Sequence, residues 1–232
     1  DGLSRVIAQL QGFEVAAAAW ESHVLPARVR GYQAAWLDEL CFAGEVSWGR
    51  LSMRRAQTGP TRATPITLAT RRDLPWLLAA RAIGGAAGTP EAAGGGEEMG
   101  PTAEAILVAL RARGASFFDD LVARTKAHPV EVEAALWQLV AAGRVTGDGF
   151  SGMRALVDRA AREAVWQVGS FRGPAPLVVS GRWSELSSGG DSQDESAVIE
   201  ALARQYLRRW GVVLRDTLSR EPQAPPWRDL LR

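Results

Sequence analysis

The segments WLDELCFAGEV (residues 36–46) and ALWQLVAAGRV (residues 135–145) repeat one pattern at a constant spacing of 99 residues. Leu37, Leu40 and Val46 of the first segment fall on leucine, leucine and valine of the second, and the Ala-Gly pair also coincides. The apolar residues have the spacing of one helix face, and the glycine is suited to end that helix. Repeats with a matching apolar pattern imply two copies of one fold.

The second copy indicates which fold is repeated. The expected elements are a helix over Thr102–Arg113 ended by Gly114, a short helix capped by Ser116 and running to about Thr125, a third helix from Pro129 to Gly143, and a β-hairpin in RVTGDGFSGMRALV (residues 144–157) with its turn at Gly147-Asp148-Gly149. Three helices and a hairpin, with a short turn between helices two and three, are typical of a winged helix-turn-helix. The predicted fold class is therefore mainly α with small β-hairpins (α+β), in tandem winged helices.

The same unit is written once more in full and once in part. In the first copy, PITLAT (residues 65–70) predicts the returning strand of a longer, Arg-rich wing. A third copy begins with an amphipathic helix over residues 196–210, ended by Gly211, and residues 212–220 resemble residues 115–124. Pro226 predicts the start of a further third helix, and no wing follows it. We therefore expect the 232 residues to be part of a longer protein.

Two Gly-rich stretches, residues 84–100 and 187–194, have the composition of flexible linkers. The predicted division follows from them. It comprises a winged helix over 1–83, a linker over 84–100, a winged helix over 101–160, a connecting segment with short strands over 161–194, and an incomplete winged helix over 195–232.

Composition excludes several classes of protein. The chain is 47% hydrophobic and 23% charged, which is globular composition. Its apolar runs fall short of the ~20 residues that a bilayer-spanning helix needs, and the N-terminus has no signal-peptide pattern, so we expect a cytoplasmic protein without membrane contact. With one cysteine and two histidines it can form neither an internal disulfide nor a structural zinc cage.

No motif for catalysis or nucleotide binding survives inspection. The sole lysine, Lys126, has no glycine loop before it, so the chain contains no nucleotide-binding P-loop. Asp38 and Glu39 suit a solvated helix face, and the Gly147-x-Gly149-x-x-Gly152 spacing lies in the predicted hairpin rather than between a strand and a helix. We expect no catalytic residue, metal or cofactor in this chain.

Positive charge is concentrated in residues 25–72, which sum to +5, although the whole chain carries only +1. The predicted third helix of the middle copy exposes Glu131, Glu133 and Gln138 rather than basic side chains, so contact with the phosphate backbone is favoured over base reading. The candidate nucleic-acid-binding residues are Arg28, Arg30, Trp48, Arg50, Arg54, Arg55, Arg62, Arg124, Lys126, His128, Arg144 and Arg154. Solvated loops remain the alternative for the arginines, a surface turn for His128, and core packing for Trp36 and Trp137.

Several phrases resemble one family in wording as well as pattern. They are LQGFE (10–14), WESHVLPARVRGY (20–32), WLDELCFAGEVSWGRL (36–51), TPITL (64–68), GRWSEL (181–186), WGVVLRDTLSRE (210–221) and APPWRDLLR (224–232). In these the chain is similar to the region after the motor in Lhr-type, large helicase-related proteins. The resemblance implies a parent that is a superfamily 2, ATP-dependent 3′-to-5′ DNA helicase with a role in DNA repair.

What the resemblance implies for this chain is narrower. ATP and Mg²⁺ are expected only in the RecA-like motor domains of the parent, which would be the partners of this segment alongside DNA. The family is also associated with uracil excision, and no residue here can be assigned to that chemistry. We expect a segment that binds and positions DNA for the motor. The alternatives are a protein-interaction scaffold, which the near-zero net charge favours, and a winged-helix transcription regulator.

Overall fold

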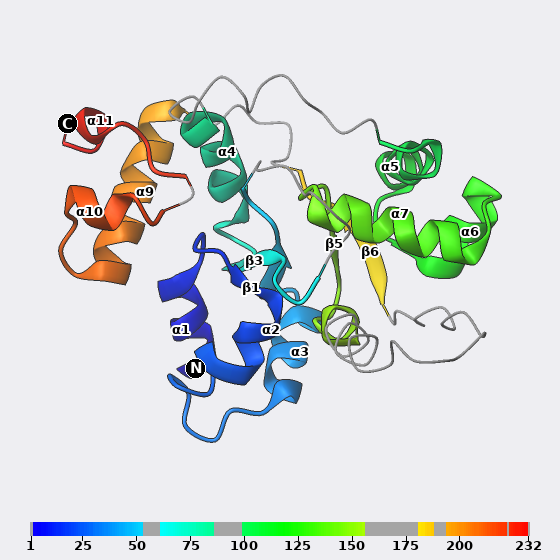
Figure 1. Ribbon diagram of the computed structural model, residues 1–232, viewed down its shortest axis with the longest axis horizontal. Coiled ribbons are helices and arrows are strands. Elements are labelled where there is room, and N and C mark those ends of the chain that lie inside the picture. Colours follow the sequence, from blue (N-terminus) through cyan, green and yellow to red (C-terminus); the bar gives the residue numbers. More distant parts are fainter. Residues whose placement is uncertain are drawn as a thin grey trace, which may run out of the picture.

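The computed structural model describes residues 2–52, 61–85, 99–155, 181–187, 194–221 and 223–231. They form two winged helices followed by a helical layer (Figure 1). The predicted fold class is confirmed, because both units combine three helices with a small antiparallel sheet.

The first winged helix is built around a three-stranded sheet in the order β1-β3-β2. Its elements are α1 (Gly2–Leu10), β1 (Val15–Ala16), α2 (Ala17–Ala19), the π-helical turn η1 (Trp20–Val24), α3 (Ala34–Phe42), β2 (Val46–Gly49) and β3 (Pro65–Thr70). Trp20 is fully buried, and its Nε1 donates to the Ile66 carbonyl at 2.8 Å, which ties the second helical segment to the central strand. The predicted returning strand at residues 65–70 is confirmed.

The second winged helix has the same topology, with strand order β4-β6-β5. Its elements are α5 (Pro101–Arg113), β4 (Ser116–Phe117), α6 (Phe118–Thr125), α7 (Pro129–Ala141), β5 (Val145–Gly147) and β6 (Arg182–Glu185). Leu37 on α3 and Leu136 on α7 are both buried in the core, as the repeat requires. Trp137 is buried too, and Trp36 is partly buried against the same core, so the core-packing interpretation of both indoles is confirmed.

The predicted hairpin after Gly143 is wrong. The partner of β5 is β6, which lies far along the chain, with Val145 opposite Glu185 and Gly147 opposite Trp183. Residues 151–155 are helical instead. The physical reason is visible in Phe150 and Met153, which are both buried and have helical rather than strand spacing.

The expected cap of α6 also differs. Ser116 lies in β4, and the N-cap residue is Phe117, whose N–H donates to the Asp120 carboxylate at 3.3 Å. A carboxylate in the first turn can supply the acceptor that Ser116 was expected to provide, which leaves Ser116 to pair with Trp183.

The remaining helices form a layer against the first winged helix, at the left of Figure 1. They are α4 (Leu74–Gly85), α9 (Glu195–Trp210), α10 (Arg215–Leu218) and α11 (Trp227–Leu230). The helix α9 packs on both α4 and α1 and ends at Gly211, which has a φ of 74°. The helix predicted to begin at Pro226 is present as α11. The division at residue 83 remains a prediction.

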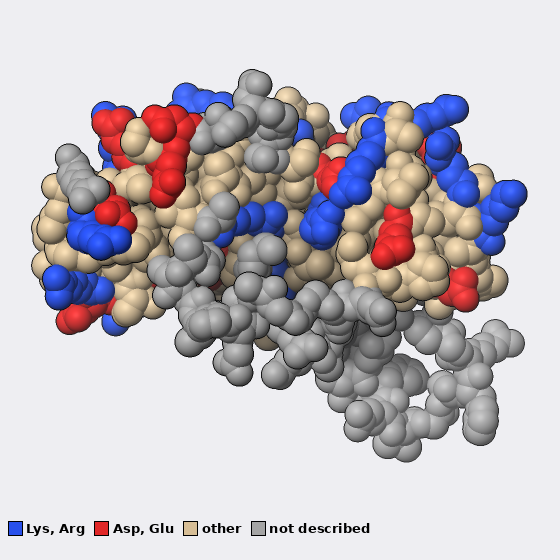
Figure 2. Space-filling model, turned by 90° about the horizontal axis from the view of Figure 1, so that it is seen from above, with Lys and Arg blue, Asp and Glu red and all other residues tan. Residues whose placement is uncertain are grey.

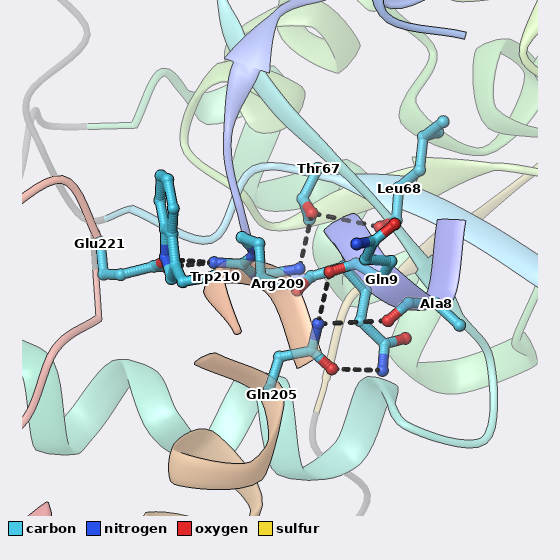
Figure 3. Close-up of polar contacts among 10 residues, drawn as sticks. Ala8, Gln9, Thr67, Leu68, Gln205, Arg209, Trp210 and Glu221 are labelled. Atoms are coloured by element: carbon cyan, nitrogen blue, oxygen red, sulfur yellow. Dashed lines mark hydrogen bonds and ion pairs between the residues drawn. The ribbon is translucent and has the colours of Figure 1, made fainter. Parts of the chain in front are cut away.

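A buried polar network joins α9 to α1 (Figure 3). The Gln205 side-chain amide donates to the carbonyls of Ala8 and Gln9 at 3.1 and 2.8 Å. One turn later, the Arg209 guanidinium forms an ion pair with Glu221, and both side chains are almost fully buried. The incomplete third unit is therefore fixed to the first winged helix by specific hydrogen bonds as well as by apolar contacts.

Candidate nucleic-acid interface

The turn between the second and third helices carries two exposed cations in each winged helix. In the first unit these are Arg28 and Arg30, between η1 and α3, and in the second they are Arg124 and Lys126, between α6 and α7. The two turns align with Ala27-Arg28 on Ala123-Arg124, so the cations occupy corresponding positions.

The local contacts hold these turns without neutralising them. The Arg28 Nη1 donates to the Val24 carbonyl at 3.2 Å. Lys126 has a φ of 55°, and its N–H caps α6 by donating to the Val122 carbonyl at 3.0 Å. Among the described residues, the ion pairs involve none of the four turn cations. Their charges are available to an anion outside the chain.

His128 begins the third helix of the second unit. It is the N-cap residue of α7, where its Nδ1 accepts from the Val130 N–H at 3.4 Å. Its own N–H donates to the Glu131 carboxylate at 3.1 Å, which completes a reciprocal capping box. The ring is exposed, so a phosphate contact stays a prediction, but capping is the role that the contacts show.

The first wing is only partly described. Arg62 is exposed at its end, and its carbonyl accepts from the Ala18 N–H at 3.1 Å. Arg54 and Arg55 lie outside the described residues. The prediction that this wing contacts DNA is therefore carried by Arg62 alone within the described residues.

Burial removes Trp48 and Arg50 from the predicted surface. Trp48 is 1% exposed, and its Nε1 donates to the Gly149 carbonyl at 3.0 Å. Arg50 is 4% exposed, and its Nη1 donates to the Ala141 carbonyl at 2.7 Å. The expected base stacking and phosphate contact conflict with these positions. The physical reason is that β2 packs against the second winged helix, so that its side chains face protein.

Arg154 is also used within the protein. Its guanidinium lies 2.6 Å from the Glu21 carboxylate and 3.1 Å from that of Asp38. The hydrogen bond to Glu21 raises the pKa of Arg154 above its ordinary value. Tyr32 donates to the same Glu21 at 2.7 Å. The expected backbone contact by Arg154 is therefore replaced by an ion-pair link between the two winged helices.

Arg144 keeps a partly exposed position beside β6. Its Nη2 lies 3.8 Å from the Glu185 carboxylate, which also accepts from Arg111 at 2.8 Å. Arg111 and the half-buried Arg81 were missed at the sequence level. The usable signal for Arg81 was one cation inside the apolar helix LPWLLAARAIGG.

Neither third helix is equipped to read bases, since α3 and α7 contain no Lys or Arg. The expectation that Glu133 is exposed is wrong, because this side chain is 5% exposed and lies among the buried residues of α7. The exposed α7 side chains at its start are Val130 and Glu131. A sequence-independent contact is therefore the only kind that the described surface supports.

Comparison with known proteins gives the family. Residues 1–71 and 192–232 each match a domain family described as "Large helicase-related protein, winged-helix domain". A protein of Mycolicibacterium smegmatis named "Lhr helicase/ probable uracil glycosylase" is 32% identical over 95% of the chain. The chain belongs to the large helicase-related family.

A second relative of this Lhr segment, the Escherichia coli "Lhr helicase/uracil glycosylase", is 27% identical over 95% of the chain. The chain spans only 14% and 15% of the lengths of these two relatives. It is thus a helicase-associated winged-helix segment. Within the described residues, every helix is too short or too polar to cross a membrane.

Proposed function

We propose that this Lhr segment binds the phosphate backbone of DNA, without reading its sequence, and positions it for the helicase motor of the parent protein. The observation that carries the proposal is the pair of exposed cations in each helix-turn-helix turn: Arg28 and Arg30 in one unit, Arg124 and Lys126 in the other. A surface that recurs at the same place of two repeated folds is better explained by a common ligand than by chance solvation.

The position of these cations suits phosphate. Each turn leads directly into the N-terminus of a third helix, α3 or α7, where backbone N–H groups are unpaired by the helix itself. Lys and Arg beside such groups contribute backbone contacts, which fix orientation but carry no sequence information. The absence of basic side chains from α3 and α7 fits this mode.

The rigid packing of the two winged helices supports a positioning role. Trp48 of β2 is buried against Gly149, and Arg154 joins the second unit to Glu21 of the first. The two turns are thereby held at a fixed separation, so a DNA backbone bound at both would have one orientation. A flexible tether between the units could not impose that.

The wider function concerns the parent protein. Both relatives are named as helicases that are also known or probable uracil glycosylases, and on that ground we propose that the parent acts in DNA repair in the cytoplasm. ATP and Mg²⁺ would act in RecA-like motor domains outside this chain. The segment itself would supply contact with DNA and with those domains.

Fluorescence anisotropy with a labelled duplex, titrated with salt, tests the proposal. The logarithm of the binding constant should fall with the logarithm of salt concentration by about 0.9 per phosphate contact. Replacing Arg30→Gln together with Lys126→Gln should reduce that slope by roughly 2 and weaken binding. The matched control is Arg204→Gln, since Arg204 is a surface cation already paired with Glu200 at 2.6 Å.

The second candidate is a protein-interaction scaffold, which the internal use of Arg50 and Arg154 favours. A scaffold predicts no salt-dependent binding of duplex or single-stranded DNA by the wild-type chain. An unchanged slope in the double variant would instead remove the turn cations from the interface.

A further inference from the structure

Guanidinium groups gather where the two winged helices meet. Arg81 of α4 donates through Nε to the Leu51 carbonyl at 3.1 Å and through Nη2 to the Gly143 carbonyl at 2.9 Å. It also donates to the Arg50 carbonyl. These acceptors are neutral, so Arg81 brings its full positive charge to the end of β2 and the turn before β5.

Two more arginines share one carboxylate next to this point. Glu185 of β6 pairs with Arg111 at 2.8 Å and lies 3.8 Å from Arg144. We define the junction cluster as Arg50, Arg81, Arg111 and Arg144. Within the described residues its acidic neighbours are Glu185 and Glu14, whose carboxylate accepts from the backbone of residues 51 and 52. The cluster therefore carries two more positive than negative charges.

The electrostatic strain of this arrangement is evident at Arg81. Burial lowers the pKa of its guanidinium, and the neighbouring positive charges of Arg144 and Arg50 lower it further, while Glu14 opposes them. Like charges held this close cost free energy unless an anion offsets them. The cost is the kind that a binding site retains for its ligand.

The cluster has a solvent-facing side. The side chains of Arg111 and Arg144 are 53% and 36% exposed. Figure 2 shows Lys and Arg side chains running from the middle of the molecule onto the half built by α5, α6 and α7. An extended anion lying on this face could reach both arginines.

We propose that the junction cluster binds phosphate groups of a DNA strand that passes over the junction between the two winged helices. The proposal rests on the proposed function, because it assigns a second contact to the same ligand. Arg111 and Arg144 touch phosphate through their planar guanidinium forks, which match its oxygens. Arg81 and Arg50 act from beneath as fixed positive charge. Glu185 competes with the ligand for both exposed arginines.

The competition by Glu185 gives a test with two opposite signs. Salt-titrated anisotropy is measured on the full 232-residue chain. The variant Arg111→Gln with Arg144→Gln should weaken binding and reduce the salt slope on duplex by up to about 2. Glu185→Gln keeps a hydrogen-bonding side chain but removes the negative charge, and should tighten binding several-fold. Arg111→Lys with Arg144→Lys should restore most of the salt slope.

The controls separate this proposal from the proposed function. Arg204→Gln should leave binding unchanged, and circular dichroism checks that each variant is folded. If Arg30→Gln with Lys126→Gln weakens binding but neither Glu185→Gln nor the junction double variant changes it, the junction proposal is overturned and the turn contacts stand. If only the junction variants act, the turns are not the interface. If the wild-type chain binds no DNA, both proposals fail.

Discussion

Ser47 of β2 and Thr146 of β5 face each other across the junction of the two winged helices, with their hydroxyl oxygens 3.4 Å apart. They are separated by 99 residues, which is the spacing that relates the two copies of the fold. Each unit therefore presents the same position of the same edge strand to its neighbour. Trp48 and Gly147, which also correspond, contact each other in the same way.

The neighbouring contacts obey the same exchange. Phe42 of the first unit lies against Gly149 of the second, and Arg50 of the first donates to the Ala141 carbonyl of the second. Phe42 corresponds to Ala141, and Arg50 to Gly149. The junction thus resembles the self-complementary interface of a two-fold dimer, formed within one chain. It also covers two strand edges that would otherwise be open to pairing.

Thr146→Val tests the hydroxyl at the centre of the junction. Thr146 Oγ1 donates to the Trp48 carbonyl at 2.6 Å in a buried setting. Valine has the same shape but no donor, so the free energy of unfolding should fall by about 1–3 kcal/mol in urea denaturation. The partner variant Ser47→Ala loses only the longer contact and should cost less than about 1 kcal/mol. Equal effects would contradict this assignment of the stronger hydrogen bond.

Gly143→Ala tests how closely the two units approach. Gly143 has a φ of 65°, and a Cβ there would collide with the Arg50 carbonyl and the Arg81 guanidinium. The corresponding Gly44 has a φ of 74° and only an ordinary contact, 3.8 Å from Arg71. Both alanines are strained by about 1–2 kcal/mol, and overpacking should add about 1–3 kcal/mol at Gly143 alone. Thermal unfolding of the two variants measures the difference, which should vanish if the units are loosely joined.

Glu221→Gln tests the ion pair that fixes α9. Glu221 pairs with Arg209, and both side chains are nearly inaccessible, with exposed fractions of 1% and 4%. Removing the carboxylate charge leaves Arg209 buried without an anion, which should cost about 3–5 kcal/mol in chemical denaturation. Glu200→Gln breaks only the exposed pair with Arg204 and should cost less than about 0.5 kcal/mol. A small effect at Glu221 would mean that water reaches this pair.

Cys41 makes stability depend on pH above neutrality. Burial raises the pKa of its thiol to about 12, and Asp38 adds to this. In the unfolded chain the thiol ionises near pH ~8.5, so only the unfolded state loses the proton between these values. Between pH 7 and pH 10 the wild-type chain should therefore lose about 2 kcal/mol more stability than Cys41→Ala.

Denaturation at several pH values measures this difference, and a thiol reagent gives a second check. Because the chain has one cysteine, all labelling reports Cys41. Native protein at pH 8 should label far more slowly than protein in denaturant. Parallel pH dependence of the two chains, or fast native labelling, would place Cys41 in contact with solvent.

Local signals in the sequence predicted the repeated unit well. The glycines at 114, 143 and 211 all have positive φ, as helix-ending positions require, and Pro129 opens α7. The apolar faces that contain Leu37 and Leu136 are buried. These features depend on residues within a few positions of each other, so a short stretch of sequence is sufficient to specify them.

The pairing of strands and the fate of the arginines could not be found in this way. β5 pairs with β6, across a long interval of chain, because Phe150 and Met153 turn the intervening residues into a helix. Arg50 and Arg154 looked like surface cations until the second winged helix covered them. Sequence by itself determined two winged helices and part of a third, because helix caps and apolar periodicity are local. Only the tertiary structure decided which cations still face solvent, because burial depends on which surface packs against which.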